Sequence, residues 1–483
     1  MGPLGKGFLS IDNRSLSIVV FSLFFSWLLA FPFQGQVLYA IAGLYDMDVY
    51  SMIYGTIAAH FAGLLLCGFI IKTMKAAKHL MLFSIILCTM GSCLFFLTPS
   101  ILWSISLPVM SFFAGGCVAA WGFYFKGFTP SSERMKTAAD GLIYSNLLMI
   151  VLNMTAMLLS PFLGLALSLL MLVLAFLAVI RLPDKEQTGL TQQSFEQNKS
   201  TAPINAVSPV RPLIFLCLFI VIITINSGLM YQVINPAFGH LQWLVSWYWA
   251  VPYIIALYIM KNLSGRISRT YILYVAIAMI GFSFIFFMVL DRSAAAYLLV
   301  NTLMLGACGI YDLFWWSILG EMLDLDKNPA RILGIGLSAN VLGVLAGGIL
   351  GMAITTTDAK NISPSVVALA VVFVILILLP LLHKRLSMLL KNHAFLTVLS
   401  EMSPNEQGKT MDSFARIGNL TERESEIASL LLKGRTYKMI ASELYLSENT
   451  IKTHIKNIYS KYNIKSKMEL VNLLLAEDKK SNN

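Results

Sequence analysis

Long apolar runs, separated by proline, glycine or charged residues, occupy most of positions 16–382. A transmembrane α-helix needs about 20 predominantly apolar residues to cross the hydrocarbon core of a bilayer. The runs that approach this length cover approximately residues 16–39, 49–72, 79–97, 101–124, 138–160, 162–180, 212–235, 241–260, 270–290, 294–319, 331–354 and 364–382. The pattern predicts twelve membrane-spanning helices and an all-α fold.

The composition agrees with lipid as the surrounding solvent. Of the 483 residues, 57% are hydrophobic and 12% are charged, whereas an average soluble domain carries about 25% charged residues. The six cysteines lie inside apolar runs without metal-ligand spacing, and the sequence contains no phosphate-binding glycine loop and no nucleophile elbow. We predict a membrane protein that contacts lipid, is not an enzyme and uses no cofactor and no metal.

The cations alternate between the two sides of the predicted membrane domain. Gaps after odd-numbered spans, such as residues 43–48 and 98–100, carry almost none, and Arg292 and Lys360 stand alone in theirs. The gaps after even-numbered spans are basic. Lysine and arginine near helix ends resist translocation, so we expect a multi-pass protein of the cell membrane, in the bacterial inner membrane, with both termini cytoplasmic.

The spans divide into two groups of six. A polar connector at residues 181–211 separates them, and residues 1–15 form a short N-terminal tail before the membrane domain at 16–382. This 6+6 arrangement resembles the major facilitator superfamily. The basic loops keep part of that family's loop signature, without its acid, in Gly68, Lys72, Lys75 and Lys78 after the second span and in Gly265, Arg266 and Arg269 after the eighth.

Composition changes after residue 382. Residues 383–415 fit a juxtamembrane helix and a linker, and residues 416–483 fit a soluble domain. Thr421 and Glu424 form a capping box that starts one helix, and Ser447 can cap a later one that runs to Tyr462. A short helix at 436–444 and a tight turn lie between them. Two short helices joined by a tight turn indicate a helix-turn-helix.

The last two helices of this domain have distinct faces. In the helix after Ser447, three isoleucines form a buried stripe, whereas Lys452, Thr453 and Lys456 point away from it, which suits a DNA major groove. A second capping box at residues 466–469 begins a fourth helix. That helix is predicted to expose an apolar edge formed by Leu470, Val471 and Leu474.

The domain strongly resembles the LuxR-type, GerE-like DNA-binding domain. The residues that match in order and spacing are Leu420, Thr421, Arg423, Glu424, Leu431, Gly434, Ile440, Ala441, Leu444, Ser447, Thr450, Ile451, Lys452, Thr453, His454, Ile458, Lys461 and Glu469. The resemblance implies a four-helix domain whose third helix enters the major groove of double-stranded DNA. It also implies that the fourth helix pairs two copies as a homodimer.

The same resemblance implies roles for individual residues. Lys452, Thr453 and Lys456 are implied to reach bases, and Lys438, Thr450 and Lys467 to hold phosphates. The sequence departs from the family at 437–439, where Tyr-Lys-Met replaces a more polar run, and at Lys467, where arginine is common. The alternative is a solvated lysine-rich face that serves protein contacts, because lysines on a helix surface are not by themselves a nucleic-acid site.

Two ionisable residues inside the predicted membrane helices are candidates for a central cavity. His60 lies in the second span and Asp312 in the tenth, and ionisable groups are costly in lipid unless they serve a function. The alternative for each is an interhelical hydrogen bond worth about 1 kcal/mol. Aromatic residues are dense in the first, seventh, eighth and tenth spans, which is compatible with a small apolar or aromatic ligand.

Together these patterns predict a membrane-embedded transcription regulator that binds promoter DNA and senses a small-molecule ligand or a membrane state. The rival hypothesis is a secondary transporter with a regulatory C-terminal domain. A structural scaffold that uses the helix-turn-helix for protein contacts is a third. The identity of the ligand, the operator and the sign of regulation do not follow from the sequence.

Overall fold

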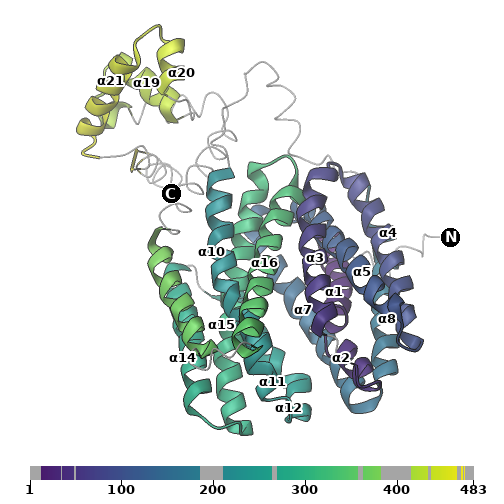
Figure 1. Cartoon of the computed structure of the whole chain (residues 1–483). Coiled ribbons are helices and arrows are strands. Elements are labelled where there is room, and N and C mark those ends of the chain that lie inside the picture. The colour runs from purple at the N-terminus through teal and green to yellow at the C-terminus, as the bar shows by residue number, and fades with distance from the viewer. Residues whose placement is uncertain are drawn as a thin grey trace, which may run out of the picture. The chain divides into compact units, whose positions relative to one another are not determined.

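The computed structural model describes residues 12–33, 35–47, 50–184, 210–263, 269–356, 363–381, 415–432, 437–464, 469–470 and 473. The regular structure in these ranges is helical, without a strand. The chain divides into two compact units, residues 1–187 with 213–382 and residues 188–212 with 383–483 (Figure 1). The second boundary falls directly after the last apolar run.

The described residues of the first unit form twelve helices that are long and apolar enough to cross a membrane, which confirms the predicted number. The N-terminal half consists of α1 (Asn13–Ala30), α2 (Gln36–Gly43), α3 (Tyr50–Ile70), α4 (Met74–Cys93), η1 (Leu94–Phe96), α5 (Ile101–Ala120), α6 (Gly122–Phe128), η2 (Ser131–Glu133), α7 (Arg134–Met154), η3 (Thr155–Leu159) and α8 (Pro161–Arg181).

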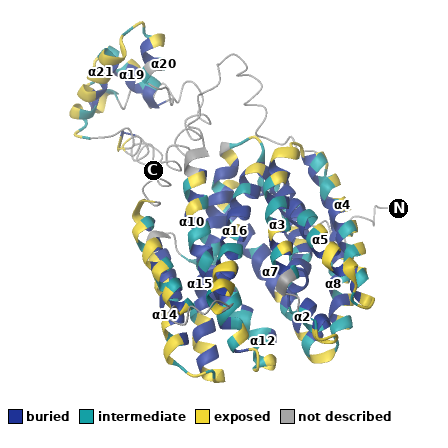
Figure 2. Ribbon diagram, in the orientation of Figure 1, coloured by how far each residue is buried: buried dark blue, intermediate teal, exposed yellow. Residues whose placement is uncertain are grey.

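The C-terminal half contributes six of the twelve spans, as the N-terminal half does. It consists of α10 (Val210–Leu229), η4 (Met230–Ile234), α11 (Asn235–Ala237), α12 (Gln242–Trp247), η5 (Tyr248–Ala250), α13 (Val251–Asn262), α14 (Arg269–Val289), α15 (Ala294–Met322), η6 (Leu323–Leu325), α16 (Pro329–Thr356) and a last helix over Pro364–Leu381. Exposed apolar side chains line the outer helices of both halves, and Ile377 is 76% exposed (Figure 2). Lipid is the solvent that suits such a surface.

The first predicted span, 16–39, is not one helix. The structure ends α1 at Ala30 and begins α2 at Gln36. Pro32 has no N–H to continue the helical ladder, and a Cβ at Gly35 would lie 2.0 Å from the carbonyl carbon of Ala30. The chain therefore turns back on itself closely enough that only glycine fits, which the hydrophobic pattern does not register.

Backbone contact joins the two halves at one end of the bundle. Helix α16 of the C-terminal half packs against α3 and α5 of the N-terminal half. A Cβ at Gly334 would lie 2.4 Å from the carbonyl oxygen of Leu64, and one at Gly68 would lie 2.5 Å from the Cα of Arg331. Side chains are too large for either position, so these glycines let the two helices touch directly.

Polar contacts reinforce the same end. Arg134 is 4% exposed and donates to both carboxylate oxygens of Asp324, at 2.7 and 2.8 Å, and to the Gly320 carbonyl at 2.7 Å. Asn328 donates to the carbonyls of Gly68 and Ile71, at 2.7 and 2.9 Å. We call this region, with the glycine contacts, the tied end of the bundle.

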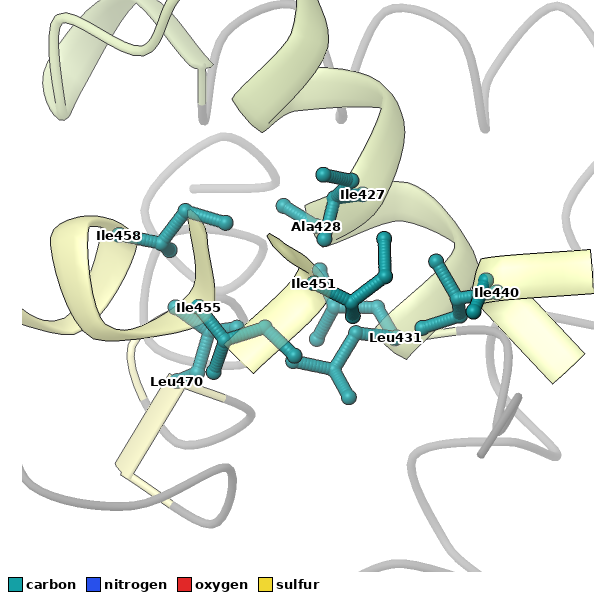
Figure 3. Packing of buried hydrophobic residues seen from close by; sticks show 10 residues of the cluster. Ile427, Ala428, Leu431, Ile440, Ile451, Ile455, Ile458 and Leu470 are labelled. Atoms are coloured by element: carbon teal, nitrogen blue, oxygen red, sulfur yellow. The ribbon is translucent and has the colours of Figure 1, made fainter. Parts of the chain in front are cut away.

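The second unit contains a small helical domain. Its described helices are α19 (Glu422–Leu432), α20 (Tyr437–Glu443) and α21 (Glu448–Lys461). Apolar residues from all three meet in one buried cluster, in which Ile427, Ile440, Ile451 and Ile458 are fully buried (Figure 3). A contiguous cluster of this kind marks an independent core.

Candidate nucleic-acid interface and membrane cavity

Helix α21 starts as its sequence predicts. The Ser447 hydroxyl accepts a hydrogen bond from the Thr450 N–H at 3.1 Å, which satisfies one of the free donors at the helix N-terminus. From there the periodicity separates two faces. Ile451, Ile455 and Ile458 are buried, and Lys452 and Lys456 are exposed.

The exposed face has the chemistry of a nucleic-acid interface. Lys452 and Lys456 lie one turn apart, and in the described part of the domain neither forms an ion pair. Thr453 is exposed, and its hydroxyl donates to the Asn449 carbonyl at 3.0 Å, which leaves oxygen lone pairs as acceptors. After Glu448 the helix has no acidic residue. The face is therefore positive and carries polar groups able to approach a phosphate or a base edge.

The structure describes only some of the residues that the family resemblance implies to hold phosphates. The Thr450 hydroxyl lies 2.8 Å from that of Ser447, so it shares its hydrogen bonds with the cap. Lys438 falls within α20, and its side chain lies outside the described structure, as does all of Lys467. The structure thus gathers Thr450, Lys452, Thr453 and Lys456 on one helix.

The capping box of α19 has an additional partner that sequence reasoning missed. The Thr421 N–H and hydroxyl donate to the Glu424 carboxylate at 2.9 and 3.0 Å, as the capping box requires. Lys461, at the end of α21, donates to the same carboxylate at 2.6 Å. Burial raises the pKa of the Glu424 carboxyl, but the hydrogen bonds from Lys461 and Thr421 outweigh burial, so that pKa lies below its ordinary value.

This arrangement makes the stability of the domain depend on pH. The Glu424→Gln variant of the 415–483 fragment is expected to lose about 1–3 kcal/mol of unfolding free energy at pH 7, because Lys461 loses a charged partner. The pKa of Glu424 is lower in the folded domain than in the unfolded chain, where it is about 4.3. The ionised carboxylate therefore stabilises the fold above about pH 4.3, and this stabilisation is lost as the pH falls through the pKa of the folded state. The difference in urea-unfolding free energy between the two proteins should therefore begin to shrink as the pH falls below about 4.3. A difference that stays constant down to the lowest pH at which both fragments fold would contradict the assignment.

A second unpredicted contact orders the turn between α20 and α21. Arg423 donates to the Leu444 carbonyl at 2.8 Å, which satisfies an acceptor at the end of α20. Tyr445 follows with φ of 53° and is 95% exposed. This left-handed conformation is unusual for a bulky residue, and the arginine anchor helps to hold it.

The predicted apolar edge is wrong for Leu470. This residue is fully buried, in the same cluster as Ile455 (Figure 3). A buried leucine cannot also contact a second copy, so the helical period places it toward the core instead. Leu473 is 37% exposed, whereas Val471 and Leu474 lie outside the described residues.

We call the first unit, residues 1–187 with 213–382, the membrane unit. In it, His60 and Asp312 line one cavity between the two six-helix halves. The cavity has a volume of about 160 Å³. The C-terminal half contributes most of its polar groups, whereas the N-terminal half contributes His60, Asn146 and apolar side chains. Sequence reasoning selected these two residues separately, and the fold brings them to the same space.

Each of the two residues is held by neutral partners. The Asp312 carboxylate accepts from the Tyr253 hydroxyl at 3.0 Å and from the Trp315 indole N–H at 3.1 Å. The His60 Nδ1 lies 3.0 Å from the Ser111 carbonyl oxygen. A carbonyl can only accept, so Nδ1 carries the hydrogen, and a neutral ring leaves Nε2 as an acceptor.

A larger cavity of about 530 Å³ lies at the opposite end from the tied end, beside the turns at Gly43, Pro161 and Gly239. We call it the vestibule. Tyr231 and Trp249 line both the vestibule and the central cavity, so the two spaces adjoin. The π-helical segments η3 and η4 contribute to the vestibule wall, and such segments recur at functional sites.

Known structures resemble the membrane unit in fold. FucP, a Major Facilitator Superfamily transporter crystallised in the outward conformation, matches 77% of this chain and 99% of its own, with a TM-score of 0.53 and 14% identity. The human organic anion transporter MFSD10 matches 77% of this chain and all of its own, with a TM-score of 0.56 and 14% identity. The membrane unit therefore has a major facilitator-like fold.

The C-terminal domain has relatives in sequence. The profile of bacterial regulatory proteins of the luxR family matches residues 418–474. The spore germination protein GerE of Bacillus subtilis is 45% identical over 56 residues, 12% of this chain and 76% of GerE. The nitrate/nitrite response regulator protein NarP of Escherichia coli is 41% identical over 58 residues, 12% of this chain and 27% of NarP. Through its C-terminal helix-turn-helix domain, the chain belongs to the LuxR family of bacterial regulatory proteins.

Proposed function

We propose that this protein is a membrane-embedded transcription regulator whose C-terminal domain binds double-stranded DNA and whose twelve-helix unit senses a small molecule. One observation carries the proposal. Helix α21 carries exposed lysines on the face opposite its buried isoleucines, and the same chain contains a twelve-helix membrane unit with an internal cavity. The matched families are regulators and transporters, so an enzymatic role has no support.

DNA recognition follows from the lysine face. Lys452, Thr453 and Lys456 contact base edges, and Thr450, Lys438 and Lys467 contact phosphates, which set the register of the domain on the duplex. With Leu470 in the core, pairing of two copies falls to Val471 and Leu474 of the fourth helix. A two-fold pair would place two α21 helices on successive turns of the major groove.

The membrane unit regulates DNA binding only if a ligand prefers one of its conformations, because equal affinity for two states shifts neither. The tied end is then cytoplasmic, in agreement with the basic loops there, and the vestibule faces outward. Residues 383–415 connect the last span to the regulator domain and carry the change. The alternative function, secondary transport with a regulatory domain, uses the same cavity but requires the ligand to leave at the tied end.

The proposal is tested by mapping the DNA bound to the full-length protein in cells, against a truncation that ends at residue 382. Defined sites that depend on residues 383–483 are the expected result. If both proteins recover the same random set of DNA fragments, DNA binding is contradicted.

The Asp312→Asn protein is expected to keep its membrane insertion and its bound sites but to lose ligand-dependent expression of a reporter placed behind such a site. The carboxylate charge is the feature of the cavity most able to discriminate between ligands, and the amide removes it without changing the shape. If the variant instead abolishes solute uptake into reconstituted vesicles while reporter control is unchanged, transport is the primary function.

A further inference from the structure

We propose that the central cavity binds a small organic cation, an ammonium ion on an apolar body about one ring in size, with Asp312 as its counter-ion. This inference rests on the proposed sensor function and specifies its ligand. It starts from the charges that surround the cavity.

Among the described residues that line the cavity, Asp312 is the only carboxylate, and neither lysine nor arginine is present. Both hydrogen bonds to the carboxylate come from neutral groups, the Tyr253 hydroxyl and the Trp315 indole. His60 is the one titratable base in the described lining, but its ring is hydrogen-bonded to the Ser111 carbonyl and not to Asp312. An ionised Asp312 carboxylate is therefore not paired with a positive charge among the described residues. Buried charges are stable when paired, so a cation is the missing partner, and an anionic ligand would be repelled.

The walls favour an organic cation over an inorganic one. Aromatic side chains from both halves line the space, among them Phe25, Tyr231, Trp249 and Trp316. Aromatic faces attract ammonium groups through the ring quadrupole. A metal cation would instead require several oxygen ligands, and in the described residues no group of three His, Cys, Asp or Glu side chains could hold one.

The size of the cavity restricts the body of the ligand. A volume of about 160 Å³ is close to that of an engineered cavity of about 150 Å³ that holds benzene. The buried Nε1 of Trp249 has no hydrogen-bond partner in the described structure, and this residue lies where the vestibule meets the cavity. A ligand that reaches the cavity from the vestibule therefore passes the unpaired indole N–H of Trp249, and the aromatic faces and the carboxylate of Asp312 line the cavity beyond the shared wall.

Three probes of similar shape and different charge test the proposal on the full-length protein in lipid nanodiscs. They are phenethylamine, which is cationic, phenethyl alcohol, which is neutral, and phenylacetate, which is anionic. In titration calorimetry, phenethylamine is expected to bind at least about tenfold more tightly than the alcohol, and phenylacetate more weakly than either, because the cavity is poorly screened.

Asp312→Asn should remove the preference for the amine while the alcohol still binds, which shows that the cavity is intact. Asp291→Asn is the matched control, because this carboxylate lies in an exposed turn outside the residues that line the cavity, and the tenfold preference should persist. Equal affinity of the wild-type protein for amine and alcohol would overturn the proposal and identify a proton as the partner of Asp312. Absence of binding by all three probes would overturn it as well.

The sensor function can fail separately from the ligand class. Phenethylamine that binds with the expected preference but leaves reporter expression unchanged would contradict sensing and leave the cation site in place. A reporter that responds to neutral or anionic compounds through Asp312, and not to amines, would support sensing and overturn the cation assignment.

Discussion

The Lys452→Ala, Lys456→Ala double variant is expected to lose at least about 30-fold in affinity for its operator. Each good base contact in the major groove contributes about 1–3 kcal/mol, and the two lysines extend from one exposed face of α21. Fluorescence anisotropy with a promoter fragment recovered from cells measures the loss. Discrimination between that fragment and unrelated DNA should fall as well, because contacts to base edges are the ones that read sequence.

Arg416→Ala serves as the control for charge. Arg416 is exposed and precedes Asn419, whose carbonyl accepts from Lys461 at the far end of α21. This variant should reduce affinity only slightly and equally for all DNA, as expected of a non-specific electrostatic change. The 415–483 fragment is suitable for both measurements, because it contains its own apolar cluster and the matched segment makes up 76% of GerE. Unchanged specificity of the correctly folded double variant would exclude α21 as the reading helix.

Local sequence signals predicted most of the described helices, whereas the predicted juxtamembrane helix and most of the predicted fourth helix of the C-terminal domain lie outside the described residues. The capping hydrogen bonds at Thr421 and Ser447 form between residues three positions apart, so the sequence contains all the information that they need. The same is true of the isoleucine stripe in α21. The number of membrane spans was also predictable, because the length of an apolar run is a local property.

Contacts between distant residues were not predictable in this way. Lys461 reaches Glu424 across 37 positions, and Arg134 reaches Asp324 across 190. In the sequence, Arg134 was only a charge in a basic loop, and Lys461 was a match to the LuxR-type pattern without an assigned partner. The prediction that Leu470 is exposed was wrong for a related reason. The period of a helix shows that one face is apolar, but it does not show whether the domain's own core or a second copy covers that face.

The membrane candidates were identified by a different signal, the cost of an ionisable group in lipid. That cost selects His60 and Asp312 from the sequence, but it does not show that they share a cavity. The glycines of the tied end are the converse case. Gly334 and Gly68 stand among other glycines, and only the position of the opposite helix shows that a side chain is excluded there.

The tied end yields the last prediction, which concerns the conformation of the membrane unit. In Gly334→Leu, the new side chain would meet the Leu64 carbonyl oxygen, which lies 2.4 Å from the position of its Cβ. Backbone cannot yield as a flexible side chain does, so α16 must move away from α3 and separate the two halves. Double electron–electron resonance between spin labels at Lys72 and Lys327, with Cys93 replaced by serine, should report a distance longer by several ångströms than in the unsubstituted protein.

If separation of the halves is the signal that reaches residues 383–415, the same variant should fix reporter expression at one level, with or without ligand, because one conformation is removed from the equilibrium. Gly55→Leu is the matched control. Gly55 lies on α3, the helix that α16 packs against, but a Cβ there has no atom within 4 Å, so both the distance and the ligand response should persist. A longer label distance in Gly334→Leu together with an intact ligand response would show that the regulator domain reads some other movement of the bundle.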